Sequence, residues 1–194
     1  MKIIRTPTLF LIIGSVAFMS ASQTFAGPAP AARIGKQSPI TIQCVHHTNN
    51  RYGLPKNLLW AIKEAEGAGN GVVSTNRTGT KNLGSWQHNT ITLPELRKYG
   101  VTGEALLNSE CAAAYVAGWK LAKAHEKFKS WKLAVAAYNA GEGSVLRALK
   151  KNPAGHQEIS SLDIPPLTKN IYLPHVETAL LRFAQEGEPG ARNE

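Results

Sequence analysis

The stretch Pro55–Glu66 reads PKNLLWAIKEAE and predicts a helix with a proline near its first turn, ending before Gly67. Its apolar stripe consists of Leu58, Leu59 and Ile62. At roughly 100° per residue, Glu66 falls about 40° from Ile62, whereas Glu64 falls on the opposite side of the helix. We therefore expect Glu66 to continue the buried stripe and Glu64 to face water.

A carboxylate on an apolar face is desolvated, and desolvation raises its pKa. A raised pKa keeps the group protonated near neutral pH, which is what a general acid requires. Because Glu66 ends the helix just before a glycine-rich segment, we expect it in the wall of a cleft. The alternative left open is a frayed last turn that lets Glu66 swing outward.

The N-terminus predicts export. Residues 1–26 have the pattern of a signal peptide, with Lys2 and Arg5 ahead of an uncharged apolar run and Ala26 at the expected cleavage position. A retained N-terminal anchor is the alternative, although the run is about half of the roughly 20 residues that a spanning helix needs. We expect a flexible leader over 27–38, a single domain over 39–185 and a loose tail over 186–194.

Within the domain the punctuation is helical, and this predicts a mainly α fold. Serine and threonine residues stand where helix caps are needed, and Thr92 with Glu95 forms a possible capping box. Residues 67–90 are rich in Gly, Asn, Ser and Thr and predict a long loop or small hairpin lining the cleft. The expected helices, besides the one ending at Glu66, cover about 39–52, 92–99, 109–127, 130–139, 144–151 and 171–185.

Composition narrows the functional classes. Hydrophobic residues make up 43% and charged residues 18%, so a core can form and a disordered polyelectrolyte is excluded. Loss of residues 1–26 would remove two of the 22 basic residues and no acidic one, lowering the formal charge from +9 to +7. A basic surface suits nucleic acid, anionic lipid or a cell-wall polymer, or it serves solubility alone. Export favours the wall.

Cysteine usage fits an exported protein. Cys44 and Cys111 are its two cysteines, and an even count in an exported chain predicts one disulfide. Two free buried thiols are the alternative.

Several segments, in order, resemble one enzyme family. They are Tyr52–Glu66 (YGLPKNLLWAIKEAE), Gly84–Asn89 (GSWQHN), Cys111 with Gly118 and Leu121, Ala137–Gly141 (AYNAG), and Tyr172 with Val176. Across about residues 40–184 their order and spacing are similar to those of the lytic transglycosylases with a goose-type-lysozyme-like fold. The long loop and the cysteine pair look most like the accessory transglycosylases of conjugation, type IV secretion and pilus systems.

The resemblance implies roles for particular residues. Glu66 would be the catalytic acid and base. Substrate-binding positions would be Ser74, Trp86, Gln87, Asn89, Tyr138 and Asn139. Tyr138 would also hold the Glu66 carboxyl in place.

Three positions depart from the family pattern. Gly67 replaces the usual serine after the catalytic glutamate, Trp86 replaces the usual methionine, and His88 replaces an apolar residue. Trp86 offers a ring that can stack on a sugar face. Gly67 removes a hydroxyl from the reacting centre, and this places efficiency in question more than reaction type.

The chemistry implied by the resemblance is cleavage of the N-acetylmuramic acid–N-acetylglucosamine bond in peptidoglycan. Two-carboxylate glycosidases need a second Asp or Glu across the bond, and residues 67–90 contain neither. The family route uses the acetamide of the substrate, ends in a 1,6-anhydromuramyl residue and needs no metal or cofactor. Expected partners are glycan strands and secretion, conjugation or pilus machinery. Once the signal is removed, no membrane-spanning segment is expected, and the location is periplasmic or otherwise exported.

Other classes remain to be weighed. A catalytically weak or inactive peptidoglycan-binding scaffold is the main alternative, favoured by Gly67 and Trp86. A nucleic-acid binder is suggested only by charge, and no nucleic-acid motif supports it. His46 and His47 are adjacent, so they point apart on a helix and form no metal site. Five lysines predict a solvated face or, alternatively, a glycan-tracking groove: Lys120, Lys123, Lys127, Lys129 and Lys132.

Overall fold

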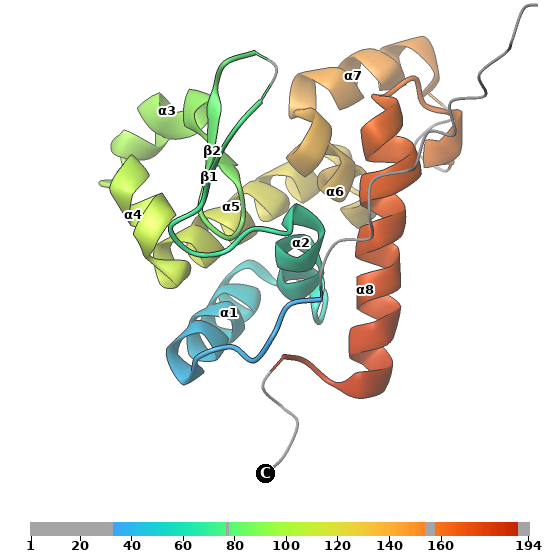
Figure 1. Ribbon diagram of the computed structural model, residues 1–194. Helices are drawn as coiled ribbons and strands as arrows, with labels where there is room; N and C mark the ends of the chain where they lie inside the picture. The colour runs from blue at the N-terminus through green and yellow to red at the C-terminus, as the bar shows by residue number, and fades with distance from the viewer. Residues whose placement is uncertain (1–32, 77, 154–157, 190–194) are drawn as a thin grey trace, which may run out of the picture.

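The computed structural model describes residues 33–76, 78–153 and 158–189. As expected, the fold is mainly α, with helices packed around the central helix α5 and a small sheet on one side (Figure 1). The predicted signal peptide over 1–26, most of the predicted leader and the end of the predicted tail lie outside the residues that the structure describes. Within the described residues, no helix combines the length and apolar character needed to cross a membrane.

The elements follow one another with short connections. The helices are α1 (Pro39–Tyr52), α2 (Leu58–Glu66), α3 (Leu93–Arg97), α4 (Gly103–Asn108), α5 (Glu110–Phe128), α6 (Trp131–Ala140), α7 (Glu142–Lys151) and α8 (Leu173–Glu186). Short 3₁₀ turns are η1 (Thr90–Thr92) and η3 (Ile159–Ser161), and η4 (Thr168–Tyr172) is a π-helical turn that leads into α8. The strands are β1 (Val73–Thr75), β2 (Lys81–Leu83) and β3 (His88–Asn89).

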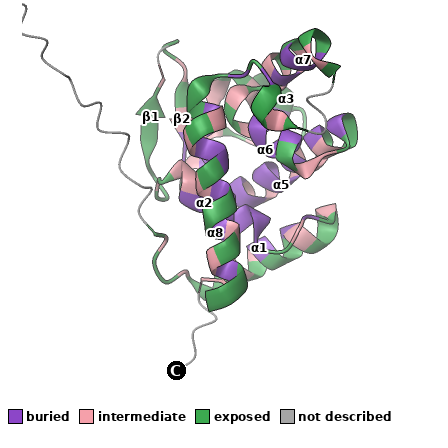
Figure 2. Ribbon diagram, turned by 90° about the vertical axis from the view of Figure 1, so that its right-hand side faces the viewer, coloured by how far each residue is buried: buried purple, intermediate pink, exposed green. Residues whose placement is uncertain are grey.

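Helix α2 lies at the centre of the main core. Its residues from Leu58 to Glu64 are all buried, because α8 packs on one side of it and α1 and α5 approach from the other. The outer helices instead bury one face and expose the other, as the alternating colours of α8 show (Figure 2). A second, smaller cluster holds the sheet against α4 and α5 and consists of Leu83, Leu96, Leu106 and Val116.

Helices α1 and α5 cross closely, and two features of the sequence allow it. A Cβ on Gly118 would lie 2.3 Å from Cγ2 of Thr48, so only glycine fits at the crossing. The expected disulfide is present between Cys44 of α1 and Cys111 of α5, with 5.2 Å between their Cα atoms. The helix that precedes α2 is thereby fixed to the helix that lines the cleft.

The glycine-rich segment folds into more than a loop. β1, β2 and β3 form an antiparallel three-stranded sheet among the described residues, with Ser74 opposite Asn82 and Asn82 opposite Asn89. Gly84 ends β2 at a φ of 66°, and a Cβ there would lie 2.2 Å from the Leu106 carbonyl oxygen. Glycine is therefore required for the turn to approach α4.

Some of the expected helix caps are confirmed. Ser109 and Ser130 accept hydrogen bonds from the N–H groups of Ala112 and Leu133 and begin α5 and α6. Two expectations were wrong. Thr92 makes no cap with its side chain, because its hydroxyl donates to the Asn89 carbonyl. Ser144 lies inside α7, which begins after Gly141.

Further differences concern elements that the pattern did not show. Helix α4 was not expected; Thr102 caps it by accepting from the Ala105 N–H. The last helical segment starts earlier than expected, because η4 precedes α8.

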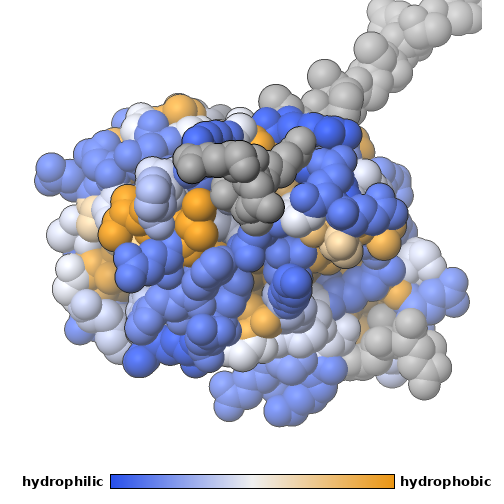
Figure 3. Space-filling view, turned by 90° about the horizontal axis from the view of Figure 1, so that it is seen from below, coloured by the Kyte–Doolittle hydropathy of each residue, from blue (hydrophilic) through white to orange (hydrophobic). Residues whose placement is uncertain are grey.

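The ends of the domain are attached rather than free. The Ile34 N–H donates to Oε2 of Glu64 at 3.2 Å, and Lys63 donates to Oε1 of Gln37 at 2.7 Å. Beyond α8, Glu188 accepts hydrogen bonds from His46 at 2.7 Å and from the Trp60 indole at 3.0 Å. The described parts of the expected leader and tail therefore contact the helices. The face seen from below is largely hydrophilic, with small separate apolar areas (Figure 3).

Candidate active site

A cleft of 460 Å³ opens where the sheet, α5 and the junction of α6 with α7 meet. The end of α2, η1 and α3 also contribute residues to its lining. Its lining combines carboxamides with a few charged groups: Glu66, Asn76, Asn82, Gln87, Asn89, Glu95, Lys120, Lys123, Asn139 and Glu142. Polar side chains of this kind can hydrogen-bond to a sugar chain.

Glu66 lies in this cleft as the last residue of α2 and is half-buried. The helix does not fray: the Gly67 N–H donates to the carbonyl oxygens of Lys63 and Glu64. Burial raises the pKa of the Glu66 carboxyl to about 7, although the hydrogen bond from Tyr172 and the charge of Lys120 act in the opposite direction. At neutral pH both protonation states are therefore populated, as a group that serves as acid and then as base requires.

Gly67 has a structural reason. It caps α2 at a φ of 64°, in the left-handed region where a residue with a Cβ is disfavoured. Glycine in place of the usual serine therefore suits the left-handed conformation that ends α2.

The expectation for Glu64 was wrong. Its side chain is buried and forms an ion pair with Arg182 of α8. The periodicity argument assumed that one side of α2 faces water, whereas α8 covers that side. Glu64 thus joins α2 to α8, so a substitution of Glu64 affects the packing of these helices and is not a suitable control for a substitution of Glu66.

The tyrosine that contacts Glu66 is Tyr172, and not Tyr138 as expected. The Tyr172 hydroxyl donates to Oε1 of Glu66 at 2.8 Å, whereas the Tyr138 hydroxyl donates to the main-chain carbonyl of Trp86 at 2.8 Å. The prediction that Tyr138 holds the Glu66 carboxyl is therefore wrong in its hydrogen bond. Tyr138 still lines the cleft, and burial and the charge of Glu66 raise its pKa well above the ordinary value.

Gln87 and Asn89 line the cleft as the sequence predicted. Gln87 has a φ of 48°, a strained conformation for a residue other than glycine. Its side chain is fixed by two hydrogen bonds, from Ser74 to Oε1 at 2.5 Å and from Nε2 to the Gly84 carbonyl at 2.8 Å. Ser74 therefore supports Gln87 from β1.

Asn89 has a structural task as well. Its Nδ2 donates to Thr80 at 2.9 Å and to Asn82 at 3.0 Å, and its Oδ1 accepts from the Ile91 N–H. Asn139 lines the far wall, and its Oδ1 accepts from the Thr168 hydroxyl at 2.6 Å. Among the described residues, Nδ2 of Asn139 donates no hydrogen bond to a protein acceptor. This amide group can therefore donate to a ligand.

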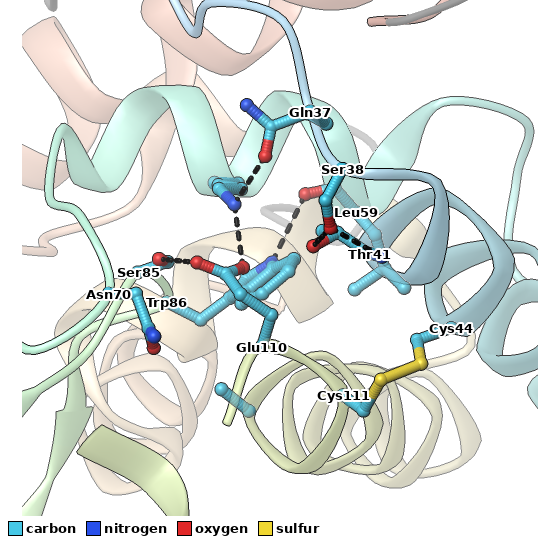
Figure 4. A network of polar contacts seen from close by, with 12 residues as sticks. Gln37, Ser38, Thr41, Cys44, Leu59, Asn70, Ser85, Trp86, Glu110 and Cys111 are labelled. Carbon is cyan, nitrogen blue, oxygen red and sulfur yellow. Dashed lines mark hydrogen bonds and ion pairs between the residues drawn. A yellow bond between two sulfur atoms is a disulfide. The ribbon is translucent and has the colours of Figure 1, made fainter. Parts of the chain in front are cut away.

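Trp86 cannot stack on a sugar, so this prediction was wrong. Its side chain is fully buried, its indole N–H donates to the Leu59 carbonyl at 3.3 Å, and the Lys63 ammonium lies 4.8 Å from the ring centre. The bulky ring fills the space beneath the loop that carries Gln87. Its support is a polar network around Glu110 (Figure 4).

In that network Glu110 accepts from Lys63 at 2.6 Å and from the Ser85 hydroxyl. Lys63 belongs to the helix of Glu66, and Ser85 belongs to the turn that carries Gln87. The network thus couples Glu66 and Gln87 through partly buried, charge-assisted hydrogen bonds.

Two of the five lysines lie where the alternative of a glycan-tracking groove placed them, rather than on a solvated face. Lys120 is half-buried and lines the cleft, as the exposed Lys123 does. Glu95 and Glu142 also line the cleft, each in an ion pair with a lysine, at 2.8 Å from Lys123 and Lys127 respectively. The sequence places Lys120 and Lys123 on one helix beside the apolar residues Leu121 and Ala124. This spacing alone does not show which face of the helix lines the cleft.

Among the described residues, no group of three or more His, Cys, Asp or Glu side chains could hold a metal ion. His46 and His47 are exposed, and His46 pairs with Glu188.

Comparison with known proteins gives a consistent result. The family described as "Transglycosylase SLT domain" matches residues 43–160. Protein IpgF of Shigella flexneri is 34% identical over 100 residues, which are 50% of this chain and 65% of that protein. Invasion protein IagB of Salmonella typhimurium (strain SL1344) is 30% identical over 113 residues, which are 57% of this chain and 70% of that protein. The chain therefore spans slightly less than two thirds of IpgF and slightly more of IagB.

Proposed function

The chain belongs to the transglycosylase SLT domain family, and on this premise we propose that it is a peptidoglycan lytic transglycosylase. It cleaves the β-1,4 bond between N-acetylmuramic acid and N-acetylglucosamine and leaves a 1,6-anhydromuramyl end. One observation carries the proposal. The Glu66 carboxyl lines a polar cleft, and its burial raises its pKa to about 7.

In the proposed reaction, protonated Glu66 donates its proton to the glycosidic oxygen, and the bond from this oxygen to C1 breaks. The acetamide oxygen of the substrate stabilises C1. The Glu66 carboxylate then accepts the proton of the muramyl C6 hydroxyl as its oxygen bonds to C1. No water is consumed, and Glu66 returns to its protonated state.

Tyr172 suits both halves of this cycle. Its hydroxyl donates to Oε1 of Glu66 at 2.8 Å, which leaves the other carboxyl oxygen for the substrate and orients the group. Gln87, Asn139 and Tyr138, all in the lining, are proposed to hold the sugars on either side of the bond. Asn89 and Ser74 act by fixing the sheet and Gln87.

The two further carboxylates of the cleft do not have the environment of Glu66. Glu95 and Glu142 are each paired with a lysine, and their side chains are 45% and 36% exposed. Either carboxylate could instead activate a water molecule as a base. Product analysis separates the two routes, because a base that activates water gives reducing ends instead of anhydro ends.

We infer that the enzyme acts outside the cytoplasm, in the periplasm or beyond, where its substrate lies. The proposed task is local opening of the wall for a secretion, conjugation or pilus apparatus. The name invasion protein, carried by the Salmonella relative, is compatible with such a task. The basic composition favours contact with the anionic wall.

The decisive experiment digests purified peptidoglycan and identifies the released fragments by mass spectrometry. The native sequence should release anhydromuropeptides, and Glu66→Gln should lower the rate by at least about 10²–10⁴-fold, the usual contribution of general acid catalysis. Glu177→Gln is the matched control, because Glu177 is an exposed carboxylate of α8 paired with Lys132. Reducing ends would show a hydrolase, and absence of release would show a binding scaffold.

A further inference from the structure

Lys120 stands on α5 with its side chain in the wall of the cleft that also contains Glu66. Its ammonium contacts two side chains that the reaction proposed above does not use. Nζ lies 3.2 Å from the Thr92 hydroxyl oxygen and 3.5 Å from Nδ1 of His88. His88 is buried, and burial, reinforced by Lys120, lowers its pKa to about 3, so it is neutral.

The protons of this group can be assigned. Nε2 of His88 lies 2.8 Å from the Ala113 carbonyl oxygen, which can only accept, so Nε2 carries the proton and Nδ1 is an acceptor. The Thr92 hydroxyl donates to the Asn89 carbonyl at 2.8 Å, so its oxygen is also an acceptor. Both therefore accept from Lys120. An ammonium has three donors, and one N–H of Lys120 is left without a partner among the described residues.

The charges around the cleft, like the free N–H of Lys120, indicate that Lys120 can bind an anionic group. Around the cleft, Lys123 is neutralised by Glu95 and Glu142 by Lys127. Lys120 has no carboxylate oxygen within 4.0 Å in the described part of the chain. Burial lowers the pKa of Lys120 to about 8, against the attraction of Glu66 and Glu95, so the ammonium is still mostly charged at pH 7. Among the described residues of the cleft, Lys120 is thus a positive charge that no carboxylate contacts directly, although Glu66 and Glu95 attract it from farther away.

We propose that Lys120 is a substrate-binding residue that takes a carboxylate of the muramyl substituent, with His88 and Thr92 holding its ammonium in place. This rests on the proposed function for the substrate class. Two sources supply a carboxylate: the lactyl group of a muramyl residue without a peptide, or the stem peptide where one is attached. The departure of His88 from an apolar residue is then explained, because His88 provides the acceptor that positions Lys120.

The test measures binding rather than cleavage. In the Glu66→Gln background, affinity is determined by calorimetry for strands with stem peptides, for strands freed of peptide by an amidase, and for uncharged chito-oligosaccharides. Adding Lys120→Gln should weaken binding about tenfold to one-hundredfold on a carboxylated ligand, the range for a hydrogen bond to a charged group. It should leave chito-oligosaccharide binding unchanged. Lys132→Gln, which removes a lysine charge paired with Glu177 outside the cleft lining, should leave all three affinities unchanged.

Each outcome decides. A loss on strands with peptides alone assigns the stem carboxylate, and a loss on peptide-free strands alone assigns the lactyl carboxylate; a loss on both is compatible with either source and also supports the proposal. Equal affinities with and without Lys120, or an equal loss on the uncharged ligand, would overturn it.

A second measurement does not depend on the folding of the Lys120 variant. Carbodiimide coupling to methylamine neutralises the carboxylates of the strands, and the Glu66→Gln protein should bind the treated strands about tenfold to one-hundredfold less tightly. Unchanged binding would refute the proposal. If the native protein released no fragments while binding still required Lys120 and a carboxylate, the proposed activity would fail and this inference would stand.

Discussion

Glu66 is subject to opposing influences, and the balance between them sets its acidity. Burial raises its pKa, while Tyr172 and Lys120 lower it, and the result is about 7. Turnover that begins with protonated Glu66 should therefore decline as the pH rises through this value. The neighbours of the carboxyl, and not the carboxyl alone, determine the pH range in which the enzyme works.

Tyr172→Phe tests that balance directly. Loss of the hydroxyl removes a hydrogen bond that favours the carboxylate, so the pKa of Glu66 should rise and the alkaline limb of the pH–rate profile should move to higher pH. Turnover should also fall about tenfold or more, because a bond to a charged group contributes roughly 1.5–3 kcal/mol. Anhydromuropeptide release across pH 5–9, an interval of about two units on either side of the pKa, measures both effects.

Tyr138→Phe is the comparison, since its hydroxyl bonds to the Trp86 carbonyl. It should leave the alkaline limb in place. If both variants shifted the limb equally, the assignment of Tyr172 as the partner of Glu66 would be wrong.

The same pKa predicts a cost in stability. The folded state holds the Glu66 proton up to about pH 7, whereas the unfolded chain releases it near its ordinary value of 4.5. Stability from this group therefore falls as the pH rises between these values. At 1.36 kcal/mol per unit, the penalty at pH 8 is at most about 3 kcal/mol.

Glu66→Gln removes this penalty and should be the more stable protein at pH 8. Urea unfolding at pH 8 and at pH 4 provides the measurement. At pH 4 the two proteins should be nearly equal, since Glu66 is neutral in both states. A constant difference at both pH values would contradict a raised pKa.

At the scale of elements, the buried pair Glu64–Arg182 joins α2 to α8. The two side chains are 10% and 13% exposed. Glu64→Gln leaves the Arg182 charge with a longer contact to Glu186, at 3.7 Å, and with the Phe183 ring, 4.3 Å from its guanidinium carbon. The loss of the close carboxylate should lower the free energy of unfolding by about 3 kcal/mol. Chemical denaturation measures the loss.

The matched control for this change is Glu177→Gln on the same helix. Its pair with Lys132 is about half exposed (52% and 53%), and such surface pairs contribute roughly 0–1 kcal/mol. Similar effects of the two substitutions would show that the interior pair does not hold α2 to α8.

The disulfide acts between α1 and α5. It closes a separation of 67 residues, for which the chain-entropy model gives about 4 kcal/mol. Replacing both cysteines by serine should lower the melting temperature substantially while leaving the cleft residues in place. Thiol titration of exported, denatured protein should find no free thiol, and two free thiols would reject the bond.

At the scale of the whole molecule, Glu188 attaches the segment after α8 to α1 and α2. Its carboxylate accepts from the Trp60 indole, and Trp60 is fully buried. A chain that ends at residue 187 should lose about 1–3 kcal/mol, because a buried donor is left without an acceptor. A chain that ends at residue 189 keeps this contact and is the control.

The effect of this truncation should depend on pH with a defined sign. Burial would raise the pKa of Glu188, but the hydrogen bonds from His46 and Trp60 outweigh it and hold the pKa below its ordinary value. The contribution of Glu188 is therefore present above the pKa of the unfolded chain and is lost as the pH falls through the folded value. Melting curves of the two chains should approach one another on acidification.

The helices show how far sequence reasoning reaches. Caps at Ser109 and Ser130 depend on local hydrogen bonds, and they were predicted correctly. Thr92 was not, because its hydroxyl takes a partner from the preceding turn and its oxygen serves Lys120. Local patterns identify helices but do not tell which of several nearby partners a hydroxyl will take.

The candidate site shows the same limit. Glu66 was predicted from helical periodicity, which depends on one element. The roles of Glu64, Trp86 and Tyr138 were assigned wrongly, since each depends on what a second element covers. Only the packing of α8 on α2 decides that Glu64 is buried and that Tyr172, rather than Tyr138, reaches Glu66.

The π-helical turn η4 has a consequence for the phase of the chain on either side of it. Thr168 begins that turn and bonds to Asn139, Tyr172 ends it and reaches Glu66, and Arg182 of the following α8 reaches Glu64. Each residue of an α-helix advances about 100°, so removal of the additional residue of a π turn would rotate everything after it by about that angle. The wide turn thus changes the direction in which the following side chains point. One continuous helical segment can therefore contact α6 before the turn has ended and α2 from its end onward.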